Sequence, residues 1–169
     1  MFDSATSPAV PVSIGSGSEL TWALFVRDRF ALPSTEGIPA LDPPVERQPA
    51  DGVPAGAWDQ WWATLVSRDP LTPLRPSEPK LAALVDAVDE EARAWEENVV
   101  TFDPPYTPMW ISEWLSEHSL AAPVRVYVVG VGHAWHRQVS PQRALVSIGL
   151  YRDHDALDVV MRDLLEHQG

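Results

Sequence analysis

The sequence predicts a single domain of the α+β class, and three observations lead to this prediction. Its 169 residues are enough to enclose one hydrophobic core. Hydrophobic residues make up 45% of the chain, which is typical of a globular protein. Apolar residues recur at helical spacing in four segments, and short apolar runs typical of strands lie between them. We expect a small mixed or antiparallel sheet of about four strands packed against about four helices.

The N-terminal third of the chain is expected to hold an arm, a strand and a long loop. Residues 1–18 are mainly Ser, Gly, Pro and small apolar residues without periodicity, which predicts an extended arm ahead of a domain spanning 19–169. Residues 20–32 are rich in aromatic and branched side chains and predict the first strand. Residues 33–56 contain six prolines and predict a loop that wraps the domain or docks on a neighbour. A disordered linker is the open alternative for this loop.

Four helices are predicted from apolar residues that recur at i, i+3, i+4 and i+7. Three of them follow a Ser, Thr or Asp residue, whose side chain can accept a hydrogen bond from the first helical turn. The helices are expected to begin, in order, near Ala57, after Ser77, after Thr107 and near Asp153.

Three strands are predicted between the third and fourth helices. Residues 124–131 are almost wholly apolar, as expected for a central strand that is covered on both faces, and residues 144–151 are similar. Residues 135–139 alternate more, and the segment 140–143 that follows them has the composition of a hairpin turn. The last two strands are therefore expected to pair as a hairpin.

Composition excludes several classes of protein. A net charge of −12 argues against general nucleic-acid binding, because such binding depends on neutralising phosphates. No apolar run approaches the roughly 18 residues of a membrane span, and the N-terminus lacks the pattern of a secretory signal. The absence of cysteine excludes disulfides and thiolate metal sites. We expect no cofactor, and a location in the cytoplasm or within a phage or multi-protein particle.

Positive charge is concentrated in one part of the chain. The 35 residues from His118 to Arg152 contain no acid, whereas the other 134 carry all 24 acidic residues and only eight basic ones. We expect Arg125 and Arg152 to form ion pairs with acidic helices of the same fold. Arg137 and Arg143 lie beside the predicted hairpin turn and are expected to be available to a partner.

His133 and His136 are the best candidates for chemistry. Imidazole is the commonest metal ligand, and Asp153 could supply a third ligand if the strand order brings it close. Residues three apart on a strand point to opposite faces, so the two histidines could share a metal only across a turn or bulge. Surface histidines are the alternative. The nearby Gly130 and Gly132 lack the remaining residues of a phosphate-binding loop and predict a bend or close backbone packing at a strand end.

Glu90, Glu96 and Glu97 lie on the polar side of the second predicted helix. Such a run of acids is commonly a solvated helix face. The alternative is an acidic docking surface, which electrostatics would favour for a basic partner.

The first predicted helix carries Trp58, Trp61 and Trp62. Trp61 and Trp62 are about 100° apart on a helix, so we expect at least one ring near the surface or under the proline-rich loop. Tryptophan is enriched at binding hot spots, and both a core role and an interface role stay open.

These features favour a non-enzymatic protein that binds one or more other protein chains, possibly basic ones. Two forms of this hypothesis stay open: a subunit of a bacterial or phage assembly, and an acidic inhibitor or immunity-type protein that masks a basic target. The alternative is a metal-dependent hydrolase that uses His133 and His136. The residues expected to contact a partner are Trp58, Trp61, Trp62, Glu90, Glu96, Glu97, Arg137 and Arg143.

Overall fold

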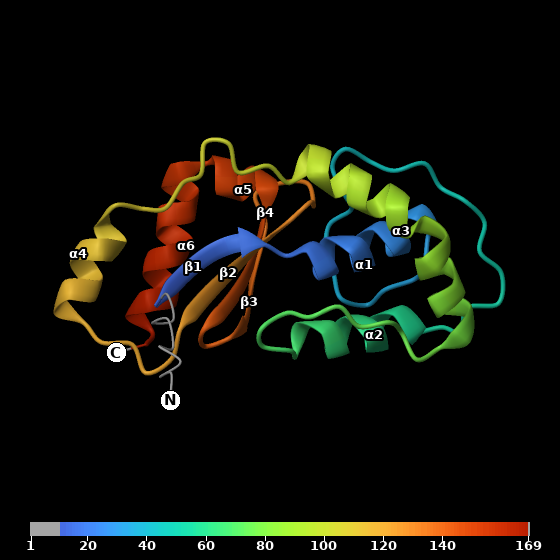
Figure 1. The fold of residues 1–169 in the computed structure, drawn as a ribbon, viewed down its shortest axis with the longest axis horizontal. Coiled ribbons are helices and arrows are strands. Elements are labelled where there is room, and N and C mark those ends of the chain that lie inside the picture. Colours follow the sequence, from blue (N-terminus) through green and yellow to red (C-terminus); the bar gives the residue numbers. More distant parts are fainter. Residues whose placement is uncertain (1–10, 169) are drawn as a thin grey trace, which may run out of the picture.

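The protein is described here by a computed structural model that covers residues 11–168. It confirms the α+β class, with a four-stranded mixed sheet between two groups of helices (Figure 1). Within these residues, no helix is both long and apolar enough to cross a membrane. The strands are β1 (Val12–Ser16), β2 (Val124–Val129), β3 (His136–Ser140) and β4 (Arg143–Ser147). The helices are α1 (Ser18–Arg29), α2 (Ala57–Val66), α3 (Pro79–Val99), α4 (Trp110–Glu117), α5 (Ile148–Arg152) and α6 (His154–Glu166).

The sheet has the strand order β1-β2-β4-β3. Strands β1, β2 and β4 are parallel, and β3 pairs antiparallel with β4 as the predicted hairpin. Val126 of β2 lies opposite Ile14 of β1 on one side and Ala144 of β4 on the other. The carboxyl ends of the three parallel strands therefore meet at one edge of the sheet, which we call the carboxyl edge.

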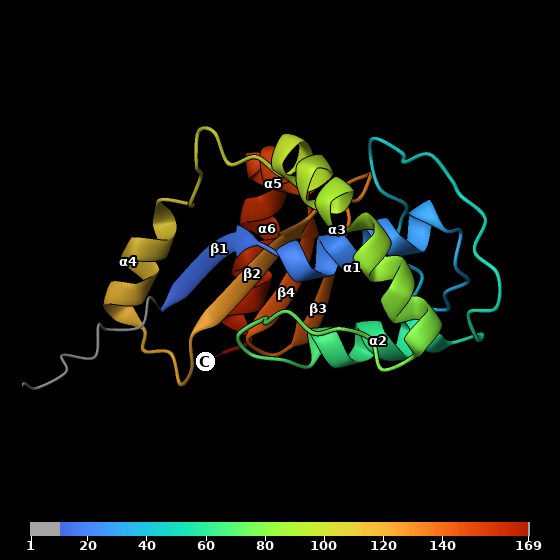
Figure 2. The same ribbon diagram turned by 45° about the vertical axis from the view of Figure 1, so that its right-hand side comes forward.

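Side-chain alternation along the strands divides the interior into two hydrophobic clusters. Val126 and Val128 of β2 pack with residues of α4, α5 and α6. Tyr127 and Val129, on the opposite face of the same strand, pack with residues of α1, α2 and α3. Figures 1 and 2 show the two groups of helices on opposite sides of the sheet. β2 is thus covered on both faces, as its apolar sequence predicts.

The prediction of a strand at 20–32 is wrong, because these residues form α1. Eight of the twelve residues of α1 are buried, so the helix lacks the polar face that would have revealed a helical period. The first strand is β1, which lies inside the segment predicted as an extended arm. The part of that arm formed by residues 1–10 lies outside the described residues.

The proline-rich loop, residues 33–56, wraps the domain, which is one of the arrangements expected from the sequence. Its Leu41 forms an antiparallel bridge with Val131, just after β2. The main-chain nitrogen of Gly132 donates a hydrogen bond to the carbonyl oxygen of Ala40 at 2.9 Å. These contacts attach the first half of the loop to the sheet.

Two arginines of α1 hold the loop from inside. Arg27 donates to the carbonyl oxygen of Ile38 at 3.0 Å, and Arg29 donates to that of Glu46 at 2.6 Å. Arg29 also donates to a carboxylate oxygen of Glu91 on α3 at 3.2 Å. Arg27 and Arg29 are 6% and 8% exposed, and their charges are offset by ion pairs with Asp28 and Glu91.

The helix ends follow from local capping. α3 begins one residue later than predicted, because Glu78 rather than Ser77 is the N-cap and accepts a hydrogen bond from the main-chain nitrogen of Leu81. The strand predicted at 144–151 ends at Ser147, whose hydroxyl caps the short helix α5. Asp153 caps α6 as expected.

Candidate functional site

The carboxyl edge of a parallel sheet is where open α/β folds usually bind ligands, so it is the first place to look for a site. In this protein the edge comprises the turn between β1 and α1, the residues that follow β2, and the end of β4. The C-terminal half of α3 lies across this edge, and two neighbouring residues of α3 determine how much room is left.

Trp95 of α3 closes the edge above β2. A Cβ atom placed on Gly130 would lie only 2.6 and 2.7 Å from two ring carbons of Trp95. The main-chain nitrogen of Gly130 donates to the hydroxyl of Thr21 on α1 at 3.3 Å. The glycine therefore allows an aromatic ring to pack directly on the backbone, which agrees with the close packing predicted at this strand end.

Glu96 of α3 closes the edge above β1. Its Oε1 atom accepts hydrogen bonds from Ser16 Oγ at 2.5 Å and from Ser18 Oγ at 2.7 Å. Ser18 is the first residue of α1, so a carboxylate of the protein stands where other α/β proteins bind a phosphate at a helix N-terminus. This part of the edge is therefore filled by the chain itself.

A small cavity remains beside Glu96, between α1 and α3. Its volume is about 60 Å³. Trp22 of α1 lines it, and Nε1 of this tryptophan is buried without a hydrogen-bond partner among the described residues. The lining residues are Ser18, Glu19, Trp22, Pro73, Ala92, Arg93 and Glu96.

Sequence reasoning missed this cavity and the serine–glutamate cluster. The signal was present in Gly15-Ser16-Gly17-Ser18, which is a typical turn between a strand and a helix. It was overlooked because the segment was assigned to an arm, so the strand before it and the helix after it were not recognised.

The residues proposed for a metal site are dispersed. His133 is exposed in the connection between β2 and β3, with a positive φ of 65°, and His136 is exposed on β3. Asp153 is the N-cap of α6 and accepts a hydrogen bond from the main-chain nitrogen of Ala156 at 3.1 Å. Within residues 11–168, no three His, Asp or Glu side chains lie together as a group that could hold a metal ion.

The three tryptophans of α2 are buried, with exposed fractions of 1% for Trp58, 3% for Trp61 and 2% for Trp62. The expectation was that at least one ring lies near the surface or under the proline-rich loop. None lies at the surface, and their hydrophobic cluster includes residues of the proline-rich loop. The physical reason is that α2 is covered in two directions. Trp58 stacks on Trp62 and donates to the carbonyl oxygen of Ala23 in α1, whereas Trp61 donates to that of Leu74 after the helix. In this fold the three rings are core residues and present no surface to a partner.

Arg143 and Arg137 both make contacts within the fold, whereas the sequence led us to expect them to be free, and a role of either in binding a partner stays a prediction. Arg143 is 9% exposed and donates to the carbonyl oxygens of Val66 and Arg68 at 2.8 and 2.6 Å. Arg137 forms an ion pair with Glu36 of the proline-rich loop at 3.0 Å.

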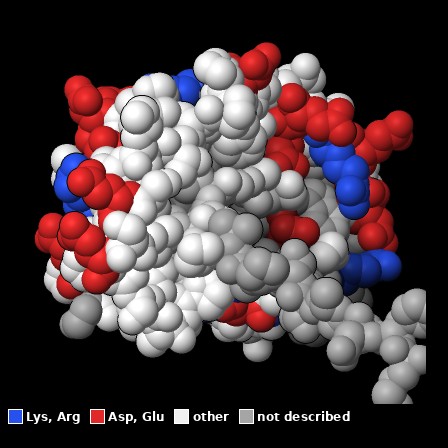
Figure 3. All heavy atoms as spheres, turned by 60° about the vertical axis from the view of Figure 1, so that its left-hand side comes forward, with Lys and Arg blue, Asp and Glu red and all other residues white. Residues whose placement is uncertain are grey.

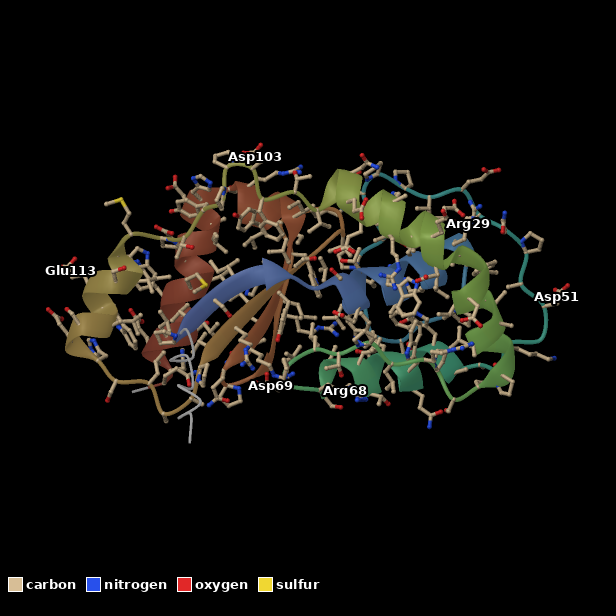
Figure 4. All side chains as sticks on the ribbon, in the orientation of Figure 1. Arg29, Asp51, Arg68, Asp69, Asp103 and Glu113 are labelled. Carbon is tan, nitrogen blue, oxygen red and sulfur yellow. The ribbon has the colours of Figure 1, made fainter. Side chains whose placement is uncertain are left out.

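The other two arginines of the acid-free segment are also used internally. Arg125 forms an intramolecular ion pair as predicted, but its partner Asp69 lies in the segment after α2 and not on a helix. Figure 4 shows Asp69 and Arg68 side by side in the segment that follows α2, next to the sheet. Arg152 differs from the prediction: it donates to the carbonyl oxygen of Val99 at 3.1 Å and to the Thr101 hydroxyl, and has no ion-pair partner within residues 11–168.

The three acids predicted for docking separate into two groups. Glu96 is bound by the serines of the β1–α1 turn, whereas Glu90 and Glu97 are exposed on α3. The proline-rich loop runs beside α3 in both ribbon views and adds the exposed acids Glu46 and Asp51 (Figures 1 and 2). We call Glu46, Asp51, Glu90 and Glu97 the α3 acidic surface. None of these four side chains has an ion-pair partner within the described part of the chain.

Another face of the molecule is less highly charged in its middle. Figure 3 shows acidic and some basic side chains gathered mainly along the margins of this face, and mostly uncharged residues in the described part between them. The acidic residues are therefore distributed over several parts of the surface, and the α3 acidic surface is a part to which a helix and a loop both contribute.

We compared the chain with protein-family models, curated proteins and solved structures, and none of them matched.

Proposed function

We propose that the protein is a non-enzymatic binding protein whose partner is a basic protein chain, and that the partner docks on the α3 acidic surface. The observation that carries this proposal is the unequal use of charge. The arginines of the acid-free segment contact acids or carbonyl oxygens of the same chain, whereas Glu90 and Glu97 of α3 and the loop acids Glu46 and Asp51 are exposed, without an ion-pair partner among the described residues.

The contacts of the individual arginines show this unequal use of charge. Arg125 and Arg137 pair with acids, and Arg143 and Arg152 bind main-chain carbonyl oxygens. Elsewhere on the chain Arg27 and Arg29 are also buried in internal contacts. A chain with a net charge of −12 that uses so much of its positive charge internally presents a strongly negative potential to solvent.

The acids of the α3 acidic surface are spaced so that they can contact a basic surface of a partner. Glu90 and Glu97 are seven residues apart on α3, which places them on one face about 10 Å apart along the axis. Glu46 is carried by the loop segment that Arg29 attaches to α3, and Asp51 precedes Gly52, which lies against Lys80 at the start of α3. Opposed charges of this kind accelerate association and are weakened by salt.

Of the two forms of the binding hypothesis, we propose the acidic inhibitor or immunity type. Residues 12–16 belong to the segment predicted as an extended arm, but they form β1 and pair with β2 of the same chain. This part of the arm therefore does not extend toward a neighbouring subunit of an assembly. Both forms keep the predicted location in the cytoplasm or within a phage or multi-protein particle.

The hydrolase alternative has no observation in its favour among residues 11–168, where His133 and His136 are exposed and dispersed. We therefore carry one function forward.

The proposal is tested by affinity capture from cells that express the protein naturally, with three tagged baits compared at low and high salt. The baits are the native protein, a variant with Glu90→Lys and Glu97→Lys, and a control with Glu113→Lys and Glu117→Lys on the exposed side of α4. The two variants change the net charge equally. We expect the native and control baits to capture a basic protein at low salt, and we expect the α3 variant not to capture it. Equal capture by all three baits would contradict docking on the α3 acidic surface.

A further inference from the structure

The cavity between α1 and α3 has the lining expected of a pocket for a cationic side chain. We propose that it receives the guanidinium group of an arginine residue of the partner. This inference rests on the proposed function and names the group by which the partner is recognised. Four properties of the cavity support it: its size, its carboxylates, its tryptophan and its position beside the α3 acidic surface.

The cavity is of a suitable size and is apolar on its walls. Its volume of about 60 Å³ accommodates several water-sized groups, since one water molecule needs roughly 10–15 Å³ by this measure. The side chains of Trp22, Pro73 and Ala92 supply the apolar walls. A compact, planar cation with an aliphatic stem matches such a cavity better than a bulky hydrophobic side chain does.

Glu96 presents a fixed carboxylate to the cavity. Both serine hydroxyls, from Ser16 and Ser18, donate to the same oxygen, Oε1. They hold the carboxylate in place, and the second oxygen, Oε2, keeps its capacity to accept hydrogen bonds. A carboxylate oriented before binding loses less conformational entropy when a guanidinium group docks. Glu19, in the first turn of α1, adds a second carboxylate at the rim.

Two positive groups near the cavity leave its potential negative. Arg93 lines the cavity, but its Nε atom donates to Asp89 at 2.9 Å, which offsets its charge. The N-terminus of α1 contributes the equivalent of about half an elementary positive charge. The carboxylates of Glu19 and Glu96 together exceed it.

Trp22 supplies a further feature of a guanidinium site. An indole ring can stack on a guanidinium plane and attract its charge, which distinguishes arginine from lysine. The Nε1–H group of Trp22 is itself buried, so the ring is the part that would contact the guanidinium group, and the N–H serves as a reporter of contacts to it.

The pocket also adjoins the surface to which the partner is proposed to bind. Glu96 lines the cavity and Glu97 follows it in α3, so the cavity lies within one helical turn of the C-terminal end of the α3 acidic surface. An arginine inserted there would anchor a partner that the exposed acids attract from a distance.

The test is an NMR titration of the ¹⁵N-labelled full chain with N-acetyl-L-arginine methylamide, followed at the indole N–H of Trp22. N-acetyl-L-citrulline methylamide, which has nearly the same shape without the charge, is the control ligand. We expect a saturable shift of the Trp22 signal below about 50 mM of the arginine probe, and none with citrulline. Glu96→Gln should weaken binding of the arginine probe about tenfold, because the amide oxygen can still accept hydrogen bonds from the serines but the side chain carries no charge. Glu117→Gln on α4 removes the same charge elsewhere and should leave binding unchanged.

Glu19→Gln is the second variant and should also weaken binding of the arginine probe. The test therefore still decides the matter if one of the two glutamine variants fails to fold. The inference is overturned if the arginine probe gives no saturable shift at Trp22, if citrulline binds as well, or if neither glutamine variant weakens binding. The capture experiment is independent of this result. Suppose that the Glu90→Lys/Glu97→Lys variant loses a basic partner in the capture experiment but the arginine probe does not bind at Trp22. The proposed function would then stand, and only the arginine pocket would be rejected.

Discussion

Arg143 is a buried arginine on β4 whose guanidinium group donates to the carbonyl oxygens of Val66 and Arg68. These contacts attach the end of α2 to the sheet. Replacing Arg143 with Met would leave both carbonyls without this donor, so we expect the free energy of unfolding to fall by about 2 kcal/mol or more. Arg152→Met, at an exposed position, should cost less than about 0.5 kcal/mol. Urea denaturation measures both, and equal losses would contradict the structural role of Arg143.

Asp59 on α2 contributes to stability in a pH-dependent way. Burial raises its pKa, but hydrogen bonds from Ser34 and Thr35 and the charge of Arg27 outweigh burial, so the pKa lies below its usual value of 3.8. The folded state therefore favours the ionised form. The stabilising contribution is present above about pH 4 and is lost as the pH falls through the lowered pKa.

Asp59→Asn tests this pH dependence, because the amide keeps the shape of the side chain and cannot ionise. We expect the difference in unfolding free energy between the native protein and the variant to be larger at pH 7 than at pH 3. Urea denaturation at a series of pH values measures it. A difference that stays constant over this range would show that ionisation of Asp59 is not linked to folding.

At the scale of elements, the packing of α3 on the carboxyl edge depends on Gly130. Ala at this position would place its Cβ within 2.7 Å of the Trp95 ring, so Gly130→Ala should destabilise the fold by about 1–3 kcal/mol. Gly15→Ala is the matched control on β1, since nothing lies within 4 Å of the position of its Cβ. Thermal denaturation of both variants tests the packing, and a neutral Gly130→Ala variant would contradict it.

The proline-rich loop is held against α1 and α3 by Arg29. Removing that side chain in Arg29→Ala would free the carbonyl oxygen of Glu46, and we expect faster tryptic cleavage after the exposed neighbouring residue Arg47. Time-resolved proteolysis with mass spectrometry measures the rate at that bond. Parallel measurement of global stability separates local release from unfolding. A cleavage rate equal to that of the native protein, at equal stability, would contradict anchoring by Arg29.

Some elements could be predicted from local pattern and others could not. The helices α2, α3, α4 and α6 were predictable because each has one apolar face, and α3 and α6 also have a capping side chain at their start. α1 could not be predicted, because it is buried on nearly all sides and its apolar residues therefore show no helical period. β1 is short and lies among Ser and Gly residues, so its identity depends on its pairing with β2, over 100 residues later.

At the scale of the whole molecule, the fold class followed from composition and pattern, whereas the candidate site depends on distant contacts. Ser16 and Glu96 are 80 residues apart, and neither is distinctive in the sequence. The same limit applies to the arginines: the sequence shows that they are segregated from the acids, but only the fold shows that Arg143 is buried and that Arg137 meets Glu36. The acidic character of the surface is thus a property of the fold as well as of the composition.

The measurement that tests the central claim most directly is the affinity of the captured partner for three purified proteins over a range of salt concentrations. These are the native protein, the Glu90→Lys/Glu97→Lys variant and the Glu113→Lys/Glu117→Lys control, measured by titration calorimetry. We predict that the α3 variant binds at least about tenfold more weakly at low salt, that the loss shrinks as salt rises, and that the α4 control loses far less. Equal losses in the two variants, or no loss in the α3 variant at any salt concentration, would contradict the claim that the α3 acidic surface binds the partner.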